Sequence, residues 1–413
     1  MTDDIASPRP GIDAVEGFSR HVHVAGVGMT RFCRPHADWS YAREAAQAAR
    51  QALRDAGLAY DDLDQAFVGY VYADSTAGQR VLYDIGMSGL PIVNVNNNCA
   101  TGSSALYLAR QAVASGAADC VLALGFEQMR PGSLAAVFPD MASPLERFDL
   151  VANQAVGHDE LPLALRYFGG AGLEHMRRFG TALSTFAAIR AKASRHAAHN
   201  PHAIFRQPLS VQDVLDSAVL WPDVMTRLMA CPPTCGAAAA VVCSERFART
   251  RGLDGRVRIA AQVLATDRTD TFATHDMRDL VGFGMARRTA RAVYEQAGVD
   301  PADVDVVELH DCFAQNELLS YEALGLCEEG EGERFVLNGD NTYGGKVVTN
   351  PSGGLLSKGH PLGATGLAQC CELVWQLRGQ AGERQVEDAR LAVQHNLGLG
   401  GACVVTLYER GCW

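Results

Sequence analysis

The sequence lacks an excess of positive charge, because 36 Lys and Arg residues are set against 47 Asp and Glu residues for a formal net charge of -11. Nucleic-acid-binding domains normally carry a basic surface, so no nucleic-acid partner is expected. No apolar run approaches the ~20 residues that a transmembrane helix requires, and we expect no membrane span. A phosphate-bearing small ligand stays compatible with this balance, since a local cluster of Arg or Lys can hold one.

The twelve cysteines include no Cys-x-x-Cys pair, and their spacing is irregular. This pattern fits neither a disulfide framework nor a zinc ribbon. The first residues, MTDDIASPRPGIDA, lack the basic start and apolar block of a secretory signal, and the last residues, ERGCW, differ from a Ser-Lys-Leu peroxisomal address. We therefore expect a reducing, cytoplasmic (bacterial) location rather than the peroxisomal matrix.

One cysteine, Cys99, lies where a predicted strand passes into a predicted helix. LPIVNVNNN alternates apolar and polar residues before it, and SSALYLARQAVASG has apolar residues at helical spacing after it. Unpaired N–H groups and the positive end of the helix dipole lower the pKa of a thiol at such a place, which favours the nucleophilic thiolate. The alternative interpretation is a buried structural cysteine.

Two short stretches of the sequence occur twice, in the same order. ARQALRDAGLAYDDLDQAFVG at 49–69 aligns without gaps on ARAVYEQAGVDPADVDVVELH at 290–310, and CATGSSAL at 99–106 resembles GATGLAQC at 363–370. These repeats predict a duplicated α/β unit with halves at 1–255 and 256–413. The alternation of helices with apolar strands favours mostly parallel sheets.

Residues from about 127 to 225 break this alternation and predict an inserted, mostly helical region that is rich in Arg, His and aromatic residues. Its cations are candidates to cover a phosphate-bearing ligand, although a solvated helical face explains any single Arg equally well. The cluster HAAHNPH at 196–202 has no cysteine or carboxylate partner nearby. We therefore expect no metal site there.

Polar residues follow predicted strands at three further places. His310 and Cys312 come directly after DVDVVEL, His360 lies in the turn SGGLLSKGHPLGATG, and a Gly-rich turn interrupts QHNLGLGGACVVTLY. In open α/β sheets, ligand sites form outside the carboxyl ends of strands, so we expect these residues to gather with Cys99. For each of these residues the alternative interpretation is structural: a turn residue, or a buried polar group that forms hydrogen bonds with the backbone.

Four segments together resemble one family. NNNCATGSSAL, ELHDCFAQNELLSYEALGLC, NPSGGLLSKGHPLGATGLAQ and QHNLGLGGACVVTLY closely resemble the thiolase domain of sterol carrier protein type thiolases, and the resemblance extends over nearly all of the chain from about residue 20. It implies a thiolase fold of the α/β class, with two duplicated βαβαβαββ halves in a layered αβαβα arrangement. It also implies an inserted loop domain, a homodimer, and action on 3-ketoacyl-CoA with CoA as co-substrate and no tightly bound cofactor.

The resemblance also implies roles for five residues. Cys99 matches the acylated nucleophile, and His360 matches the histidine that activates it. His310 replaces the Asn that holds an oxyanion-hole water, and the N–H groups of Gly398 and Cys99 form a second oxyanion hole. The second cysteine of other thiolases aligns with Asn396, so the acid/base role falls to Cys312, as in the sterol carrier type.

Two departures from the family pattern appear in the sequence. PPTCGAAAA at 232–240 has Cys235 where relatives carry an Asp, which leaves the CoA contacts unknown, and no lipid-carrying domain follows the thiolase segments before Trp413. Lipid transfer would then need a separate protein. The activity expected is that of a 3-ketoacyl-CoA thiolase in fatty acid, branched-chain or sterol side-chain degradation. The alternatives are a thiolase-fold retro-aldolase or C-acyltransferase with a small lipid-binding or OB-fold partner, and a non-catalytic acyl-CoA or sterol binder.

Overall fold

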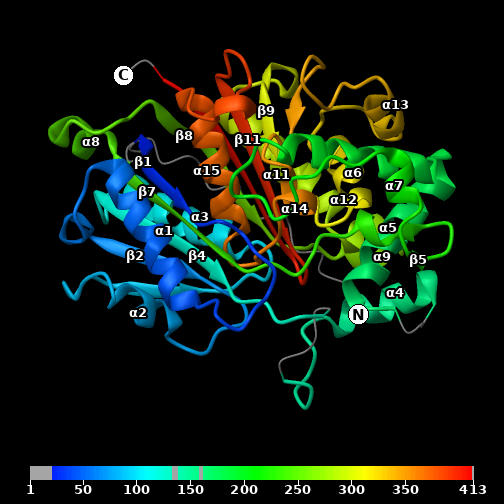
Figure 1. The fold of residues 1–413 in the computed structure, drawn as a ribbon, viewed down its shortest axis with the longest axis horizontal. Helices are drawn as coiled ribbons and strands as arrows, with labels where there is room; N and C mark the ends of the chain where they lie inside the picture. Colours follow the sequence, from blue (N-terminus) through cyan, green and yellow to red (C-terminus); the bar gives the residue numbers. More distant parts are fainter. Residues whose placement is uncertain (1–20, 133–137, 158–160, 412–413) are drawn as a thin grey trace, which may run out of the picture.

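The computed structural model describes residues 21–132, 138–157 and 161–411. Its main sheet has ten strands in the order β10-β9-β11-β12-β8-β1-β7-β4-β2-β3 (Figure 1). The strands of the first half are β1 (Val22–Met29), β2 (Gln65–Gly69), β3 (Ile92–Val95), β4 (Cys120–Glu127) and β7 (Gly236–Ser244). The strands of the second half are β8 (Val257–Ala265), β9 (Val306–Glu308), β10 (Val348–Thr349), β11 (Leu391–Gly398) and β12 (Ala402–Arg410).

The strand order reads the same outward from the centre of the sheet, where β1 lies beside β8. One side runs β1-β7-β4-β2-β3 and the other runs β8-β12-β11-β9-β10. The repeated sequences fall on equivalent elements, because α1 and β2 in the first half correspond to α11 and β9 in the second. This order supports two duplicated halves, and a boundary between residues 255 and 256 remains our proposal.

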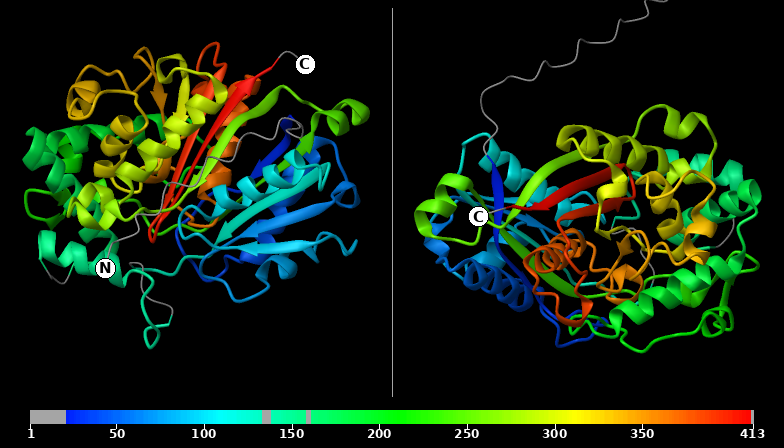
Figure 2. Two further views of the ribbon diagram at one scale, coloured as in Figure 1. Left: turned by 180° about the vertical axis from the view of Figure 1, so that it is seen from behind. Right: turned by 90° about the horizontal axis from the view of Figure 1, so that it is seen from above.

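The helices cover both outer faces of the sheet and fill the space between its halves. They are α1 (Tyr41–Ala56), α2 (Ala77–Leu82), α3 (Thr101–Ala114), α4 (Glu146–Val156), α5 (Leu163–Phe179), α6 (Leu183–Ala197), α7 (Val211–Leu215), α8 (Glu245–Arg251), α9 (Asp270–Ala273), α10 (Met277–Leu280), α11 (Phe283–Ala297), α12 (Ala314–Ala323), α13 (Gly332–Leu337), α14 (Gly354–Ser357) and α15 (Thr365–Arg378). Helix α1 packs on β1 and β7, α11 packs on β8 and β12, and α3 and α15 pack together in the middle (Figures 1 and 2). This arrangement confirms the predicted αβαβα layering.

The expectation of mostly parallel sheets is wrong, because each half is mixed. Strand β2 runs parallel to β3 and β4, but β7 runs antiparallel to both β1 and β4. In the second half the equivalent pair, β11 and β12, is a hairpin closed by the short turn at 399–401. The long insertion between Glu127 and Gly236 separates β4 from β7, so the sequence hides the equivalent hairpin in the first half.

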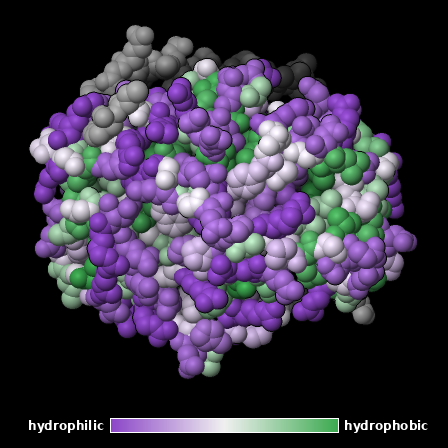
Figure 3. Space-filling view, turned by 45° about the horizontal axis from the view of Figure 1, so that its top comes forward, coloured by the Kyte–Doolittle hydropathy of each residue, from purple (hydrophilic) through white to green (hydrophobic). Residues whose placement is uncertain are grey.

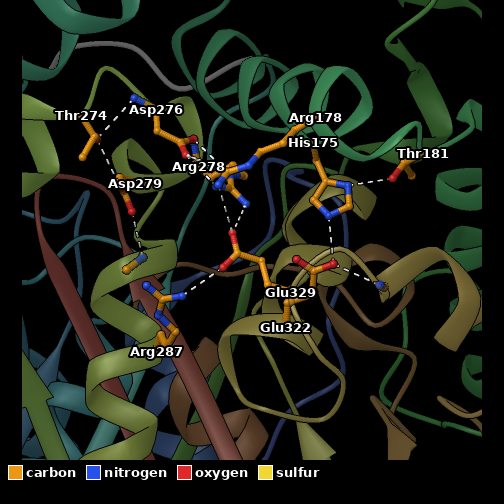
Figure 4. Close-up of polar contacts among 12 residues, drawn as sticks. His175, Arg178, Thr181, Thr274, Asp276, Arg278, Asp279, Arg287, Glu322 and Glu329 are labelled. Carbon is orange, nitrogen blue, oxygen red and sulfur yellow. Dashed lines mark hydrogen bonds and ion pairs between the residues drawn. The ribbon is translucent and has the colours of Figure 1, made fainter.

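In the described part of the segment between β4 and β7, helices α4 to α7 are the main regular elements, as predicted, beside a small hairpin of β5 (Val219–Trp221) and β6 (Met225–Thr226). Polar contacts, one buried and one exposed, attach it to the second half (Figure 4). His175 Nε2 on α5 lies 2.9 Å from Glu322 Oε1 on α12. Arg178 on the same helix contacts Asp276 at 3.4 Å. These contacts hold α5 of the insertion against α12 and against the start of α10.

The surface in Figure 3 mixes hydrophilic and hydrophobic residues, without one continuous hydrophobic area. Within the part of the chain that the structure describes, no helix combines the length and the apolar character that crossing a bilayer requires. This finding agrees with the absence of long apolar runs in the sequence.

Candidate active site

Cys99 lies in a tight turn between β3 and α3, two residues before the helix begins, as the sequence predicts. Asn98 has a φ of 50°, a left-handed conformation that Asn adopts more readily than most residues. Its amide donates to Leu399 O at 3.2 Å, and Asn97 N–H donates to Thr101 Oγ1 at 2.8 Å. These bonds fix the turn and hold Cys99 at the start of α3, against the turn that follows β11.

The thiol of Cys99 is buried, and the expectation that its pKa is low is wrong for this structure. Burial, followed by the nearby Glu127 carboxylate, raises the pKa of Cys99 to about 12. The loss of hydration of the charged form therefore outweighs the helix dipole. In the resting protein Cys99 is a neutral thiol, so nucleophilic attack needs a base that accepts its proton.

This pKa predicts how the reactivity of Cys99 depends on pH. Below the pKa of a thiol the thiolate fraction rises about tenfold for each pH unit, so we expect alkylation of Cys99 by iodoacetamide to rise steadily from pH 6 to pH 9. Mass spectrometry of the Cys99 peptide measures the rate, and Cys99→Ala identifies that peptide. A plateau below pH 8 would mean that the thiol is already ionised in the resting protein.

His360 is placed to be that base. Its Nδ1 lies 2.7 Å from Thr365 Oγ1, and the Thr365 hydroxyl donates to Pro361 O at 3.0 Å. Because the Thr365 hydroxyl donates its only hydrogen to the Pro361 carbonyl, it can only accept from His360, and Nδ1 of His360 must carry the ring proton. Burial lowers the pKa of His360 to about 3, so the ring is neutral. Its Nε2 is buried without a hydrogen-bond partner among the described residues and offers a free lone pair.

The structure brings Cys99, His310 and His360 together. Their nearest Sγ and ring nitrogen atoms all lie within 4.8 Å of one another, and the two imidazole rings meet edge to face with centroids 5.2 Å apart. A thiol and two imidazoles are ligands that zinc accepts, and within the described ranges this is the trio whose geometry could hold a metal ion. Without a metal, the same trio is one nucleophile beside two neutral imidazoles.

Cys312 lies in the turn between β9 and α12, close to His310 in the sequence, and is buried. Burial and the thiols of Cys231 and Cys99 raise the pKa of Cys312 well above its usual value. The N–H of Cys231 donates to Cys312 O at 2.9 Å. Cys312 is therefore a protonated thiol near Cys99 at rest, and it can act as a proton donor.

Gly398, the last residue of β11, passes very close to the Cys99 turn. A Cβ atom at this position would lie 2.2 Å from Asn97 O, so only glycine lets the two segments approach. Gly398, Cys99 and His310 line a small cavity of about 10 Å³, which has room for about one water molecule. The free space beside Cys99 is therefore small, and neither His360 nor Cys312 lines it.

Two neighbouring residues escaped the sequence analysis. Glu127, at the end of β4, accepts hydrogen bonds from the N–H groups of Val71, Tyr72 and Gly363 at 3.0 to 3.1 Å and joins three loops around Cys99. Its position directly after the apolar residues CVLALGF is the same sequence signal that marks His310. Cys231, four residues before Cys235, has no comparable signal.

The histidines of HAAHNPH do not converge on one point. His196 contacts Asn350 O and Thr342 Oγ1, His199 pairs with Glu383, and His202 stacks on Trp375. The three imidazole rings therefore make separate contacts with different parts of the chain. Several cations of the insertion also have internal partners, as Arg166 has with Asp149 and Lys192 with Glu317, so these two do not cover a phosphate-bearing ligand.

Comparisons with known proteins agree with this geometry. The thiolase N-terminal domain model matches residues 22–143, and the thiolase C-terminal domain-like model matches residues 266–408. Human sterol carrier protein 2 is 53% identical over 397 residues, which cover 95% of this chain and 72% of that protein. The matches to the two thiolase models fall on opposite halves of the sheet.

Two further matches cover nearly all of the chain. The benzoylsuccinyl-CoA thiolase subunit BbsB of Thauera aromatica is 37% identical over 404 residues, covering 96% of this chain and all of that protein (100%). A solved Ltp2-ChsH2(DUF35) aldolase has a TM-score of 0.80 at 22% identity and covers 95% of this chain and 99% of that one, a likeness of fold. The chain therefore belongs to the thiolase family, in its sterol carrier protein branch.

Proposed function

We propose that this protein is a 3-ketoacyl-CoA thiolase that cleaves its substrate with CoA through an acyl-cysteine intermediate, in fatty acid, branched-chain or sterol side-chain degradation. The observation that carries the proposal is the convergence of Cys99, His310 and His360 within 4.8 Å. A relative that matches the chain along its length is named a thiolase of a CoA thioester, which supports CoA as the co-substrate.

In the first half-reaction, His360 Nε2 takes the proton of Cys99, and the thiolate attacks the C3 ketone. The N–H groups of Cys99 and Gly398 stabilise the alkoxide that forms. Cleavage of the C2–C3 bond then releases the enolate of the shortened CoA ester, with His310 donating to its oxygen. Each well-placed oxyanion donor contributes a factor of ~10²–10³ in rate.

Cys312 supplies the proton transfers at the enolate carbon and at CoA, and His360 returns its proton to the Cys99 thiolate when CoA displaces the acyl group. Its thiol protonates the departing enolate, and the thiolate that remains deprotonates the incoming CoA, which then attacks the acyl-cysteine. One thiol can act as both acid and base because the proton that it gives in the first step returns in the second. A positioned acid/base group of this kind contributes ~10²–10⁴ in rate.

A panel of 3-ketoacyl-CoA substrates tests the proposal, with thiolysis followed by loss of the Mg-enolate absorbance. CoA-dependent cleavage of at least one member supports it. Cleavage of the corresponding 3-hydroxyacyl-CoA esters to an aldehyde or ketone without CoA would instead support the retro-aldolase alternative, with a small partner protein. Transfer of an acyl group onto another carbon nucleophile would support the C-acyltransferase alternative. Binding without thioester exchange would support a non-catalytic acyl-CoA or sterol binder.

We also propose a homodimer that forms along β3. This strand ends the sheet, so one row of its backbone N–H and C=O groups has no neighbouring strand among the described residues. Val93 on β3 is 40% exposed, and the nearby Met87 is 76% exposed. An unpaired edge beside exposed apolar side chains is a surface that a second copy can cover symmetrically.

The dimer predicts an effect of charge on β3. Val93→Lys is expected to convert the protein to a monomer at micromolar concentration, because each copy would bury a lysine at the shared edge. Light scattering measures the mass, and Val219→Lys is the matched control, since Val219 lies on the separate strand β5 and is 63% exposed. A wild-type protein that is monomeric at this concentration would contradict the proposal.

A further inference from the structure

We propose that a buried chain of hydrogen bonds fixes which ring nitrogen of His310 carries its proton. The inference deepens the proposed function and rests on it, since it concerns how His310 donates to the substrate oxygen. It assigns positioning roles to residues of both halves. The members of this relay, in order, are Gly366, Gln394, Ser103, Asn396 and His310.

The direction of the relay is set at Gly366. Its carbonyl oxygen can only accept hydrogen bonds, so the amide atom of Gln394 that lies 2.7 Å away must be the donating Nε2. The other amide atom, Oε1, accepts from the hydroxyl of Tyr408. The orientation of the Gln394 amide is therefore determined at both ends.

The same Gln394 Nε2 lies 2.7 Å from Ser103 Oγ and donates its second hydrogen there. The hydroxyl of Ser103 keeps its own hydrogen for its other contact, the Asn396 amide oxygen at 2.9 Å. This bond orients the Asn396 amide with Oδ1 toward Ser103. Nδ2 then points to the other side, toward His310.

Nδ2 of Asn396 lies 3.1 Å from Nδ1 of His310. An amide NH₂ group can only donate, so Nδ1 must be the unprotonated nitrogen. Burial and the nearby His360 lower the pKa of His310 well below its usual value, so the ring has a single proton. That proton is on Nε2, where His310 can use it as a donor.

The two histidines of the site therefore have opposite tautomers. His360 carries its proton on Nδ1 because Thr365 accepts it, and His310 carries its proton on Nε2 because Asn396 occupies Nδ1. One ring accepts the proton of Cys99, and the other donates to the substrate oxygen.

The relay is packed tightly where α3 and α15 cross. A Cβ atom at Gly366 would lie 2.1 Å from Ser103 Oγ and 2.7 Å from Asn396 Oδ1. Glycine is thus required for the helices to approach closely enough to close the relay. All side chains of the relay are buried, so bulk water does not compete for their hydrogen bonds.

NMR of the full-length protein with ¹⁵N-labelled histidine rings tests the inference, because protonated and bare ring nitrogens have distinct shifts. His310→Gln identifies the His310 signals by their loss. We expect wild-type His310 to be the Nε2–H tautomer. Ser103→Ala should give a mixture of tautomers, and Asn396→Asp should place a proton on Nδ1, since a carboxylate can only accept. Ser194→Ala removes another buried helical hydroxyl with one donated and one accepted bond, and should change neither signal.

A wild-type His310 protonated on Nδ1 would overturn the relay, and that measurement needs no variant to fold. Unchanged tautomers in folded Ser103→Ala and Asn396→Asp would also overturn it. With 3-ketoacyl-CoA as substrate we expect kcat to fall ~10²–10³-fold in Asn396→Asp, with a smaller change in KM. If the tautomers respond as expected but the wild-type protein has no thiolase activity, the relay stands and the proposed function fails.

Discussion

Cys99→Ala is expected to remove both acyl transfer to the protein and thiolysis, with a loss of rate of about 10⁴-fold or more. Brief incubation of the wild-type protein with an acyl-CoA should add one acyl mass to the peptide that contains Cys99. The thiol is the group that becomes bonded to substrate, and no neighbouring hydroxyl or amine in the described site can replace it. Peptide mass spectrometry and the enolate assay measure the two effects.

The matched control is Cys243→Ala, which removes a fully buried thiol on β7. It is expected to keep both the acyl label and the activity. An acyl label on Cys235 or Cys312, rather than on Cys99, would contradict the assignment of the nucleophile. So would full thiolysis by the Cys99→Ala protein.

Cys312→Ala is expected to separate two steps that the wild-type enzyme performs together. Acylation of Cys99 by a simple acyl-CoA needs no proton transfer at carbon, since the CoA thiolate leaves readily, so the variant should still take up the acyl label. Exchange of the acetyl-CoA methyl protons with deuterated solvent does need an acid/base group. We expect this exchange to fall by ~10²-fold or more.

Cys243→Ala again serves as the control, and it should exchange these protons at the wild-type rate. Exchange near the wild-type rate in Cys312→Ala would show that another group moves the proton at carbon. His360 would then be the first candidate, because its Nε2 is free and lies near Cys99. Loss of the acyl label together with exchange would mean that Cys312 also supports acylation.

The rule that polar residues gather beyond the carboxyl ends of strands located much of the site from sequence. It selected Cys99 and His310, which follow β3 and β9. It also selected His360, which follows the short helix α14 and not a strand, so the rule is wrong for this residue. The structure nevertheless brings the three together from loops that are far apart along the chain. The rule works because each of these loops leaves a strand of the sheet or enters one of the two central helices. It does not depend on contacts between distant residues.

The state of the Cys99 thiol could not be predicted in the same way. A helix start predicts a lowered pKa, but burial and Glu127 depend on loops that close over the thiol only in three dimensions. The antiparallel orientation of β7 could not be predicted for a similar reason. The insertion separates β7 from its partner β4 by more than a hundred residues of sequence, so no hairpin pattern marks the pair. Local sequence patterns predicted the strands, the helices and the site residues. The desolvation of Cys99 and the pairing of β7 with β4 depend on contacts that form only in the folded chain.

Helices α3 and α15 both begin beside the site, one just after Cys99 and the other five residues after His360. The N-terminus of each helix carries roughly half a unit of positive charge. The resting groups, a protonated thiol and two neutral rings, carry no charge on which this field can act. The field acts when a thiolate, alkoxide or enolate appears, so little reorganisation energy is needed as negative charge develops. The N-termini of α3 and α15, which occupy equivalent places in the two halves, thus provide a fixed positive field at the site before any anion forms.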